Sequence, residues 1–217
     1  MKIALFGATG KTGRIFLLKA LEKGHHVTAL VRNPSKLQVE DEKLNVVKGS
    51  LLNKQDIHDT INGAELVVNL SGHVKDSPPN LQLSSMEHIV SAMRENGVQR
   101  IITLTGGGVR DHANDQPKFI DKLIVFIMKN LAGKGTRNAL LDGIAHIDYL
   151  KNQKDIEHTV VRGPMLKDEP AKGKIEIGHV GTVQGIKLTR EDLAEFIVNE
   201  VDSKDYINQM PFVTNGK

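Results

Sequence analysis

The sequence predicts an α/β fold in which helices cover both faces of a doubly wound parallel sheet. Short runs rich in valine, isoleucine and leucine alternate with longer segments of helical periodicity, as expected of successive β-α-β units. A glycine-rich loop at residues 7–13 follows the first apolar run directly and leads into the first helical segment. A strand, a glycine loop and a helix in this order are typical of a Rossmann-type sheet.

The chain has the size of a single α/β domain. Its 217 residues are 39% hydrophobic and 25% charged, as in ordinary soluble globular proteins. We therefore expect one domain over residues 1–217, with elements on the substrate side at about residues 106–150 and 165–217.

Composition argues against several other classes of protein. The net charge is only +3 and the basic residues are interleaved with acidic ones, so nucleic-acid binding is not expected. The chain has no cysteine and its nine histidines lack the HExxH and HxH spacings, so no metal site is expected. The apolar run at the start is too short for a signal peptide or a membrane span, which predicts a cytoplasmic location.

Six segments have the near-continuous apolar composition of strands that are covered on both faces. These segments are residues 2–6, 27–31, 45–48, 66–70, 100–105 and 159–162. The simplest arrangement is a sheet of six parallel strands.

Cap residues and glycines mark where helices begin and end. The first helix is expected from about Thr12 to Lys23, and the glycine that follows ends it. Helical spacing places Ile15, Leu18 and Leu21 on its buried face.

Three further helices are expected. One begins after Asn53, a good N-cap residue, and another covers residues 81–95. The last begins at Thr189, where Thr-Arg-Glu-Asp is a variant of the capping box, and its role is structural.

Residues 106–135 interrupt the alternation of strands and helices. They contain a polar segment at residues 110–118, followed by the apolar run 123–128. Six consecutive apolar residues favour a buried helix, and the alternative is a helix that packs on a substrate, a partner or a lipid surface.

Gly7, Gly10 and Gly13 are suited to bind the pyrophosphate of a dinucleotide. Gly7 permits a tight turn out of the strand, Gly10 lets the backbone approach the pyrophosphate, and Gly13 lets helix and strand pack closely. Amide groups at the start of the helix would face the anionic ligand. A nucleoside triphosphate loop is excluded because it needs a glycine at the place where Leu5 stands.

The end of the second expected strand favours NADP(H) over NAD(H). An acidic residue about 20 residues beyond the loop would bind the ribose hydroxyls of NAD, but Arg32 stands at this place. Arg32, Asn33 and Lys36 supply cationic and hydrogen-bonding groups that suit a 2′-phosphate. The alternative interpretation of Arg32 is an ordinary surface charge.

Five segments, in this order along the chain, resemble a known family: GATGKTG, LVRNPSK, NLSG, ITLTGGG and HTVVRGPML. Together they are similar to the atypical short-chain dehydrogenase/reductase family, in the branch that contains NmrA-like proteins and flavin reductases of the biliverdin reductase B type. The resemblance covers most of the chain. It implies a strand order of 3-2-1-4-5-6, NADPH along the carboxyl ends of the strands, and a substrate pocket formed by the C-terminal segments.

The glycine motif and the resemblance together assign a cofactor site. The chain departs from the branch in two places, since the branch often has Asp where Ser50 stands, and Arg-Pro-Gly or Arg-Pro-Pro where this chain has Arg-Gly-Pro. The residues expected at NADP(H) are Gly7, Thr9, Gly10, Lys11, Thr12, Gly13, Arg32, Asn33, Lys36, Ser50, Leu51, Leu70, Ser71, Gly72, Thr105, Gly106, Pro164 and Met165.

Thr105 is the candidate catalytic residue, because the wider family places a serine or threonine here, near the nicotinamide and the substrate carbonyl. The alternative is a hydroxyl that only stabilises the turn at the strand end. The Tyr-x-x-x-Lys pair that would supply acid and base chemistry is missing, since Gln153 stands four residues after Tyr149 and Tyr206 lies in the tail.

These observations favour an oxidoreductase that transfers a hydride from NADPH to a planar conjugated small molecule, such as a flavin or a quinone. Such acceptors can take their proton from solvent, so the missing pair is tolerable. The alternative is a sensor of the NmrA-like kind that binds NADP(H) without turnover. An epimerase or dehydratase is disfavoured by the missing pair, and the sequence leaves the substrate and the oligomeric state open.

Overall fold

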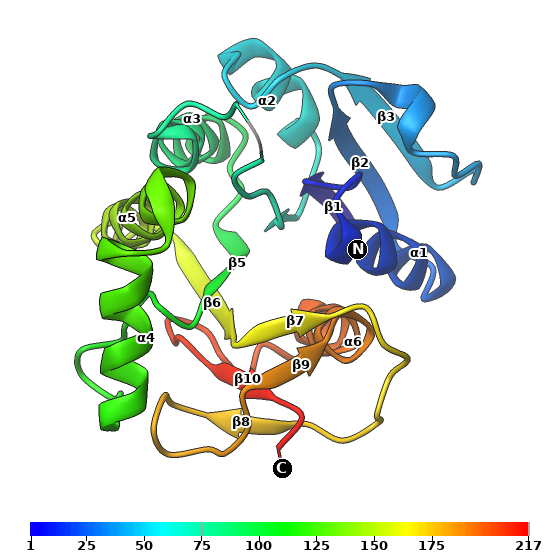
Figure 1. Ribbon diagram of the computed structural model, residues 1–217. Helices are drawn as coiled ribbons and strands as arrows, with labels where there is room; N and C mark the ends of the chain where they lie inside the picture. Colours follow the sequence, from blue (N-terminus) through cyan, green and yellow to red (C-terminus); the bar gives the residue numbers. More distant parts are fainter. Residues whose placement is uncertain (75, 217) are drawn as a thin grey trace.

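The computed structural model describes residues 1–74 and 76–216, and it centres on an eight-stranded sheet (Figure 1). The strand order is β3-β2-β1-β4-β5-β6-β10-β8. The strands are β1 (Lys2–Phe6), β2 (His26–Val31), β3 (Leu44–Lys48), β4 (Leu66–Asn69), β5 (Arg100–Gly106), β6 (Glu157–Gly163), β8 (Glu176–Gly178) and β10 (Phe212–Thr214). All neighbours pair in parallel except β8, which is antiparallel to β10.

The six expected strands and their order are confirmed, but the expected count of six is too low. β10 extends the sheet beside β6, and β8 closes that edge. β7 (Met165–Lys167) and β9 (Lys187–Thr189) form a separate parallel pair. Each of these four additional strands has three residues. A run of three residues is too short to show the periodicity of a strand. Only its pairing with a neighbouring strand identifies it as one.

Helices cover both faces of the sheet, and each face has its own hydrophobic core. α1 (Lys11–Glu22) and α6 (Arg190–Ser203) lie on one face, and α2 (Lys54–Ile61), α3 (Leu81–Glu95) and α5 (Gly133–Lys151) lie on the other (Figure 1). β1 contributes to both cores because successive side chains of a strand point to opposite faces. Ile3 and Leu5 join the first core, and Ala4 and Phe6 join the second.

The expected caps are confirmed. The Asn53 side chain accepts hydrogen bonds from the amides of Gln55 and Asp56 at the start of α2, and Thr189 accepts one from the amide of Asp192 at the start of α6. These bonds satisfy amides that have no partner within the helix.

One expectation about the first helix is wrong. Leu18 is 48% exposed and Ile15 is half-buried, whereas Phe16, Leu17 and Leu21 are buried. The helix is therefore rotated relative to the face that we predicted. The sequence offers apolar residues on both sides of this helix, and the packing against α6 and the sheet selects one of them.

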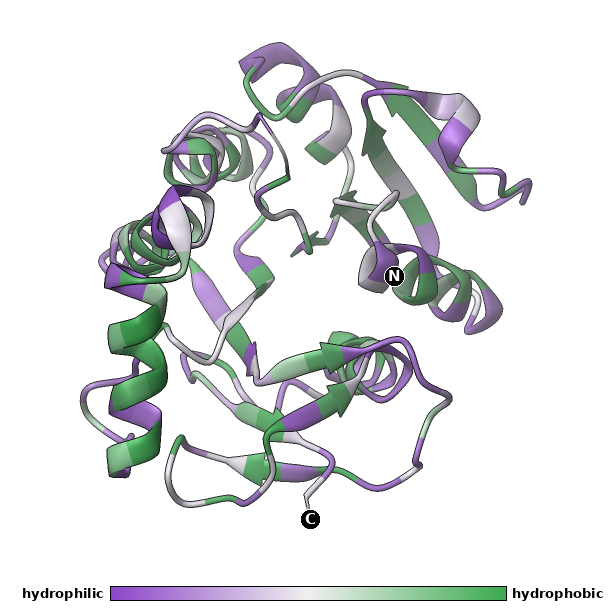
Figure 2. Cartoon of the chain, viewed as in Figure 1, coloured by the Kyte–Doolittle hydropathy of each residue, from purple (hydrophilic) through white to green (hydrophobic). Residues whose placement is uncertain are grey.

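Residues 106–151 differ most from expectation. α5, with 19 residues, was not predicted, because its N-terminus carries two glycines and its N-cap residue Ala132 forms no side-chain cap. The apolar run does form a helix, α4 (Phe119–Asn130), but its predicted burial is wrong, since none of its residues is buried. Figure 2 shows its hydrophobic residues along one edge of the molecule. The packing of α4 on a substrate, a partner or a lipid surface stays an open alternative.

Within residues 1–74 and 76–216, no helix is both long enough and apolar enough to cross a membrane. The same residues include no group of three or more histidine, aspartate or glutamate side chains that could hold a metal ion.

Candidate cofactor and substrate site

Two positions where β1 leads into α1, one in the loop and one in the first turn of the helix, have room for glycine only. Gly7 has a φ of +89°, and a Cβ atom there would lie 2.6 Å from the carbonyl carbon of Leu70. A Cβ atom on Gly13 would lie 2.1 Å from the carbonyl oxygen of Gly7. These contacts keep the first turn of α1 close to the ends of β1 and β4.

The N-terminus of α1 is suited to bind an anion. Gly10 is the N-cap residue and has no side chain to accept a hydrogen bond, and the first turn contains no acidic residue. The first amides of a helix have no partner within it, so those of Lys11, Thr12 and Gly13 can donate to a ligand. This loop therefore fits the pyrophosphate of a dinucleotide.

Lys11 links this loop to the C-terminal part of the chain. Its Nζ contacts the carboxylate of Asp168, which follows β7, and Arg190 Nη1 lies 2.6 Å from the other oxygen of that carboxylate. The hydrogen bond from Lys11, with the charges of Arg190 and Lys11, holds the pKa of Asp168 below its ordinary value. Lys11, the lysine in the proposed anion site, is thus already paired with the exposed carboxylate of Asp168.

Two cations stand beyond the end of β2. Arg32 and Lys36 are exposed, and neither forms an ion pair within the described part of the chain. Asn33 orders the turn between them, because its side chain accepts hydrogen bonds from the amide and the hydroxyl of Ser35 at 3.2 and 2.8 Å. The two free cations fit a phosphate group.

The segment after β3 is held by helix α2. The amide of Ser50 donates to Asp56 Oδ2 at 2.8 Å, and Leu51 is half-buried beside it. Asp56 thus fixes the backbone of this segment through the amide of Ser50.

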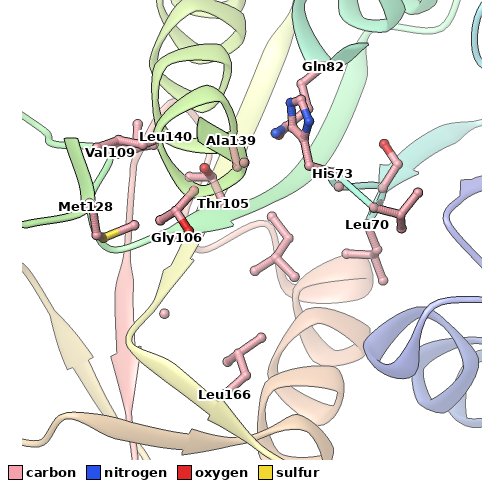
Figure 3. Close-up of a pocket in the computed structure, with 18 of the residues that line it drawn as sticks. Leu70, His73, Gln82, Thr105, Gly106, Val109, Met128, Ala139, Leu140 and Leu166 are labelled. Carbon is pink, nitrogen blue, oxygen red and sulfur yellow. The ribbon is translucent and has the colours of Figure 1, made fainter. Parts of the chain in front are cut away.

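A cavity of about 670 Å³ opens at the carboxyl ends of β4, β5 and β6 (Figure 3). Six of the expected site residues line it: Leu70, Ser71, Gly72, Thr105, Gly106 and Pro164. Its apolar lining includes Val109, Met128, Leu140 and Leu166. The expected residues at the ends of β2 and β3 lie outside this cavity. Met165 is 60% exposed and does not line it, whereas the next residue, Leu166, does.

Thr105 lies one residue before the end of β5, and its hydroxyl is unengaged. Its Oγ1 has no hydrogen-bond partner within residues 1–74 and 76–216. Helix α5 comes close to it, since a Cβ atom on Gly143 would lie 3.4 Å from this hydroxyl. By contrast, the hydroxyl of Ser71 donates to Asn69 Oδ1 at 2.5 Å and is committed to the turn after β4. Compared with Ser71, Thr105 therefore has the freer hydroxyl.

Sequence reasoning missed two residues at this cavity. His73 lines it, and His73 Nε2 lies 2.7 Å from Oδ2 of Asp142, a buried carboxylate on α5. The only signal in the sequence was the position of His73 directly after NLSG. Asp142 gave none, because α5 was not predicted and 69 residues separate the pair.

Curated relatives match this chain in part. YwnB, an uncharacterized protein of Bacillus subtilis, is 32% identical over 108 residues, which are 50% of this chain and 48% of that protein. Cinnamoyl-CoA reductase 1 of Petunia hybrida is 27% identical over 130 residues, which are 54% of this chain and 39% of that protein. The chain therefore spans about half or less of the length of these relatives.

Solved structures share the fold over the whole chain. A protein of Bacteroides thetaiotaomicron assigned as an epimerase has a TM-score of 0.82 at 20% identity, covering 100% of this chain and 97% of its own. A Streptococcus pneumoniae protein assigned as an NADH-flavin reductase has a TM-score of 0.78 at 18% identity, covering 99% of both chains. A short-chain dehydrogenase/reductase of Veillonella parvula, solved in complex with NADP, has a TM-score of 0.77 at 19% identity, covering 98% and 94%.

A comparison with a family model agrees with the features of the site, which are the glycine loop, the open helix N-terminus and the adjoining cavity. A family model described as NAD(P)H-binding matches residues 7–204, which is most of the chain. The chain belongs to this NAD(P)H-binding family.

Proposed function

We propose that this protein is a cytoplasmic, NADPH-dependent reductase of a planar conjugated acceptor such as a flavin or a quinone. The observation that carries the proposal is the cavity of about 670 Å³, which is lined by Thr105 and five other residues expected at NADP(H) and extends to the apolar side chains of Val109, Met128, Leu140 and Leu166. Its volume is within the range of small-molecule sites, which is about 300–1,000 Å³. A protein that only bound the dinucleotide would not need the apolar part of this cavity that lies beyond the expected cofactor residues.

The residues at the other end of the site would hold the cofactor. The amides of the α1 N-terminus would bind the pyrophosphate, and Arg32 and Lys36 would bind a 2′-phosphate. When bound, the reduced nicotinamide supplies the hydride. The free phosphate-binding cations and the missing carboxylate at the end of β2 support NADPH rather than NADH.

The cavity walls would position the acceptor. Val109, Met128, Leu140 and Leu166 are apolar, so they exclude water and favour a flat hydrophobic ring. Thr105 offers the nearby free hydroxyl, which can orient the acceptor or the cofactor by a hydrogen bond. Holding two reactants in register can lower a barrier by about 7–11 kcal/mol, so positioning is a sufficient contribution. The NADH-flavin reductase assignment of the Streptococcus pneumoniae protein and the NADP complex of the Veillonella parvula protein support this proposal.

One observation favours the second candidate, an NmrA-like sensor without turnover. The Lys11–Asp168 contact connects the glycine loop to an exposed segment after β7. An anion at the loop would compete for Lys11 and would release Asp168. Such a change could be transmitted to a protein partner.

An NADPH oxidation assay against a panel of flavins, quinones, dyes and small aldehydes separates the two candidates. Cofactor titrations are run beside it. We expect consumption of NADPH with a flavin or a quinone. The sensor would be the better hypothesis if NADPH binds tightly but no acceptor in the panel is reduced, and if NADPH and NADP+ bind with different affinities.

A further inference from the structure

A histidine that lines the cavity forms a close contact with a buried carboxylate behind it. His73 follows β4, and Asp142 projects from α5. His73 Nε2 lies 2.7 Å from Asp142 Oδ2, and the exposed fractions of the two side chains are 12% and 1%. The histidine therefore reaches the cavity while the carboxylate behind it is closed off from water.

Asp142 is fixed by contacts with a second helix. Its Oδ2 accepts a hydrogen bond from the amide of Gln82 at 2.7 Å, and its Oδ1 accepts one from the amide of Leu83 at 3.0 Å. These amides belong to the first turn of α3, which favours negative charge. The carboxylate is thus held as an acceptor, and Nε2 of His73 is the nitrogen that donates to it.

This arrangement leaves the other ring nitrogen of His73, Nδ1, free to bind a ligand. Nδ1 of His73 has no hydrogen-bond partner within residues 1–74 and 76–216, and the ring lies among the cavity residues in Figure 3. Thr105 lines the same cavity, and its hydroxyl approaches Gly143, the residue next to Asp142. Proteins orient an imidazole for proton transfer by a hydrogen bond from one ring nitrogen to a carboxylate, as from Nε2 of His73 to Asp142.

Resting on the proposed function, we infer that His73 is a catalytic proton donor and that Asp142 is the residue that positions it. The inference also narrows the acceptor to a conjugated carbonyl compound, a quinone or an enone, because its oxygen must gain a proton. For a quinone, NADPH, quinone and one proton give NADP+ and hydroquinone. The hydride brings both electrons, the Nδ1–H bond of protonated His73 breaks as an O–H bond forms, and solvent then restores the proton.

The surroundings of His73 contain one competing imidazole. His146, on α5, lies with its Nδ1 3.2 Å from the carbonyl oxygen of Asp142. Burial lowers the pKa of His146, so it stays neutral near neutral pH and does not act as a second donor. Asp142 and His146 are thus two ionisable side chains that interact with His73.

A purely structural role is the alternative, because the pair also ties the segment after β4 to α5 and α3. His73→Gln separates the two roles, since glutamine can still donate to Asp142 but cannot deliver a proton. His26→Gln is the matched control. His26 is exposed at the first residue of β2, whereas the cavity lies at the carboxyl ends of the strands. Thermal unfolding and NADPH titration of both variants show whether fold and cofactor affinity are intact, and we expect affinity to stay within about twofold.

The kinetic test compares two acceptors. With menadione, a quinone, His73→Gln is expected to lower turnover by about a hundredfold, the scale of general acid catalysis. The wild-type menadione rate should depend on pH, and the variant should lose this dependence because it has no proton donor at position 73. With FMN, which forms a stable anion on accepting hydride, the variant should lose much less activity than with menadione. Asp142→Asn should alter the same pH profile.

A binding test does not depend on turnover. 4-Nitrophenol added to the NADP+-bound protein should become more ionised than in solution, because protonated His73 stabilises the phenolate. His73→Gln should abolish this spectral change. If His73→Gln fails to fold, His73→Ala with added imidazole replaces it, and imidazole should restore menadione reduction.

The possible failures are distinguishable. Unchanged menadione kinetics and an unchanged nitrophenol spectrum in His73→Gln would overturn the role of His73 and leave the reductase proposal intact. If the wild type binds NADPH but reduces no acceptor, the proposed function fails, and the nitrophenol titration then decides alone whether His73 is a proton donor.

Discussion

Arg162 and Asp115 form a buried ion pair with two hydrogen bonds. Arg162 Nη1 lies 2.6 Å from Asp115 Oδ2, Nη2 lies 3.0 Å from Oδ1, and the side chains are 0% and 2% exposed. The arginine also donates to the carbonyl oxygens of Met210 and Val109, and the aspartate accepts from the amide of Val180. The pair thereby ties the loop after β5, whose Val109 lines the cavity, to β6 and to the C-terminal segments.

Asp115→Asn should strongly destabilise the protein, because it leaves the Arg162 guanidinium buried without its counter-charge. Breaking one side of a buried pair typically reduces the free energy of unfolding by about 3–5 kcal/mol. Urea denaturation of the variant measures this loss. Asp155→Asn is the control, since Asp155 forms a similar two-bond pair with Arg94 at the exposed surface and should change stability little. Equal losses of stability in the two variants would contradict the role of the buried Arg162–Asp115 pair in stabilising the fold.

The same pair predicts a dependence of stability on pH. Burial by itself raises the pKa of Asp115, but the hydrogen bonds and the charge of Arg162 outweigh it and hold this pKa below its ordinary value. A lowered carboxyl pKa stabilises the fold above the pKa of the unfolded chain, and this contribution is lost as pH falls through the folded value. In urea titrations, the difference in free energy of unfolding between wild type and Asp115→Asn should therefore be largest at about pH 7 and smaller at about pH 3.

Arg32→Ala should weaken NADPH binding by about tenfold to a hundredfold and leave NADH binding nearly unchanged. A hydrogen bond to a charged group contributes about 1.5–3 kcal/mol, and only NADPH has the 2′-phosphate. Calorimetric titration with both cofactors tests this expectation. Lys151→Ala removes an exposed cation at the end of α5, away from the site, and serves as the control. Equal affinities of the wild type for NADPH and NADH would refute the NADP preference.

Thr105→Val should reduce turnover by about tenfold to a hundredfold while NADPH affinity changes by no more than a few fold. Valine keeps the shape of threonine and removes the free hydroxyl that lines the cavity. Thr105→Ser, which keeps the hydroxyl, should retain most of the activity. Steady-state kinetics of the two variants with one acceptor provide the measurement. Wild-type turnover in Thr105→Val would leave this hydroxyl only a turn-stabilising role.

Asp168→Asn should tighten NADPH binding by about two- to fivefold at low salt, because it frees Lys11 and removes a negative charge near the expected pyrophosphate. The gain should fade at high salt, which screens exposed charges. Glu169→Gln removes the same charge from the next residue without touching the Lys11 contact. NADPH titrations at two salt concentrations make the comparison, and weaker binding by Asp168→Asn would show that Asp168 supports the cofactor site.

Residues 110–134 should exchange their amide protons faster than the central strands, and NADPH should slow this exchange. None of the α4 residues is buried, and Met128 of α4 faces the cavity. Asp115, held by Arg162, should be the slowest point of the segment. Hydrogen exchange read by mass spectrometry tests this with and without cofactor. Exchange as slow as in the central strands in both states would contradict it.

Local sequence determined the glycine loop, the first six strands and most helix ends. A glycine with positive φ, an Asn53 cap or a run of apolar residues acts through neighbours in the chain, so its effect can be predicted without the rest of the fold. The resemblance supplied the strand order, which the structure confirms. It also pointed to Thr105, which the structure places in the cavity wall.

Tertiary structure alone decided which residues meet at the site. His73 and Asp142 are 69 residues apart, and Arg162 and Asp115 are 47 apart, so no local pattern relates them. Packing also decided that α4 stays exposed and that Leu18 faces outward, although both segments have apolar residues. An apolar residue is buried only if another element covers it, and a charged pair is stable in the interior only if both partners arrive together. These conditions are set by the assembled sheet and helices.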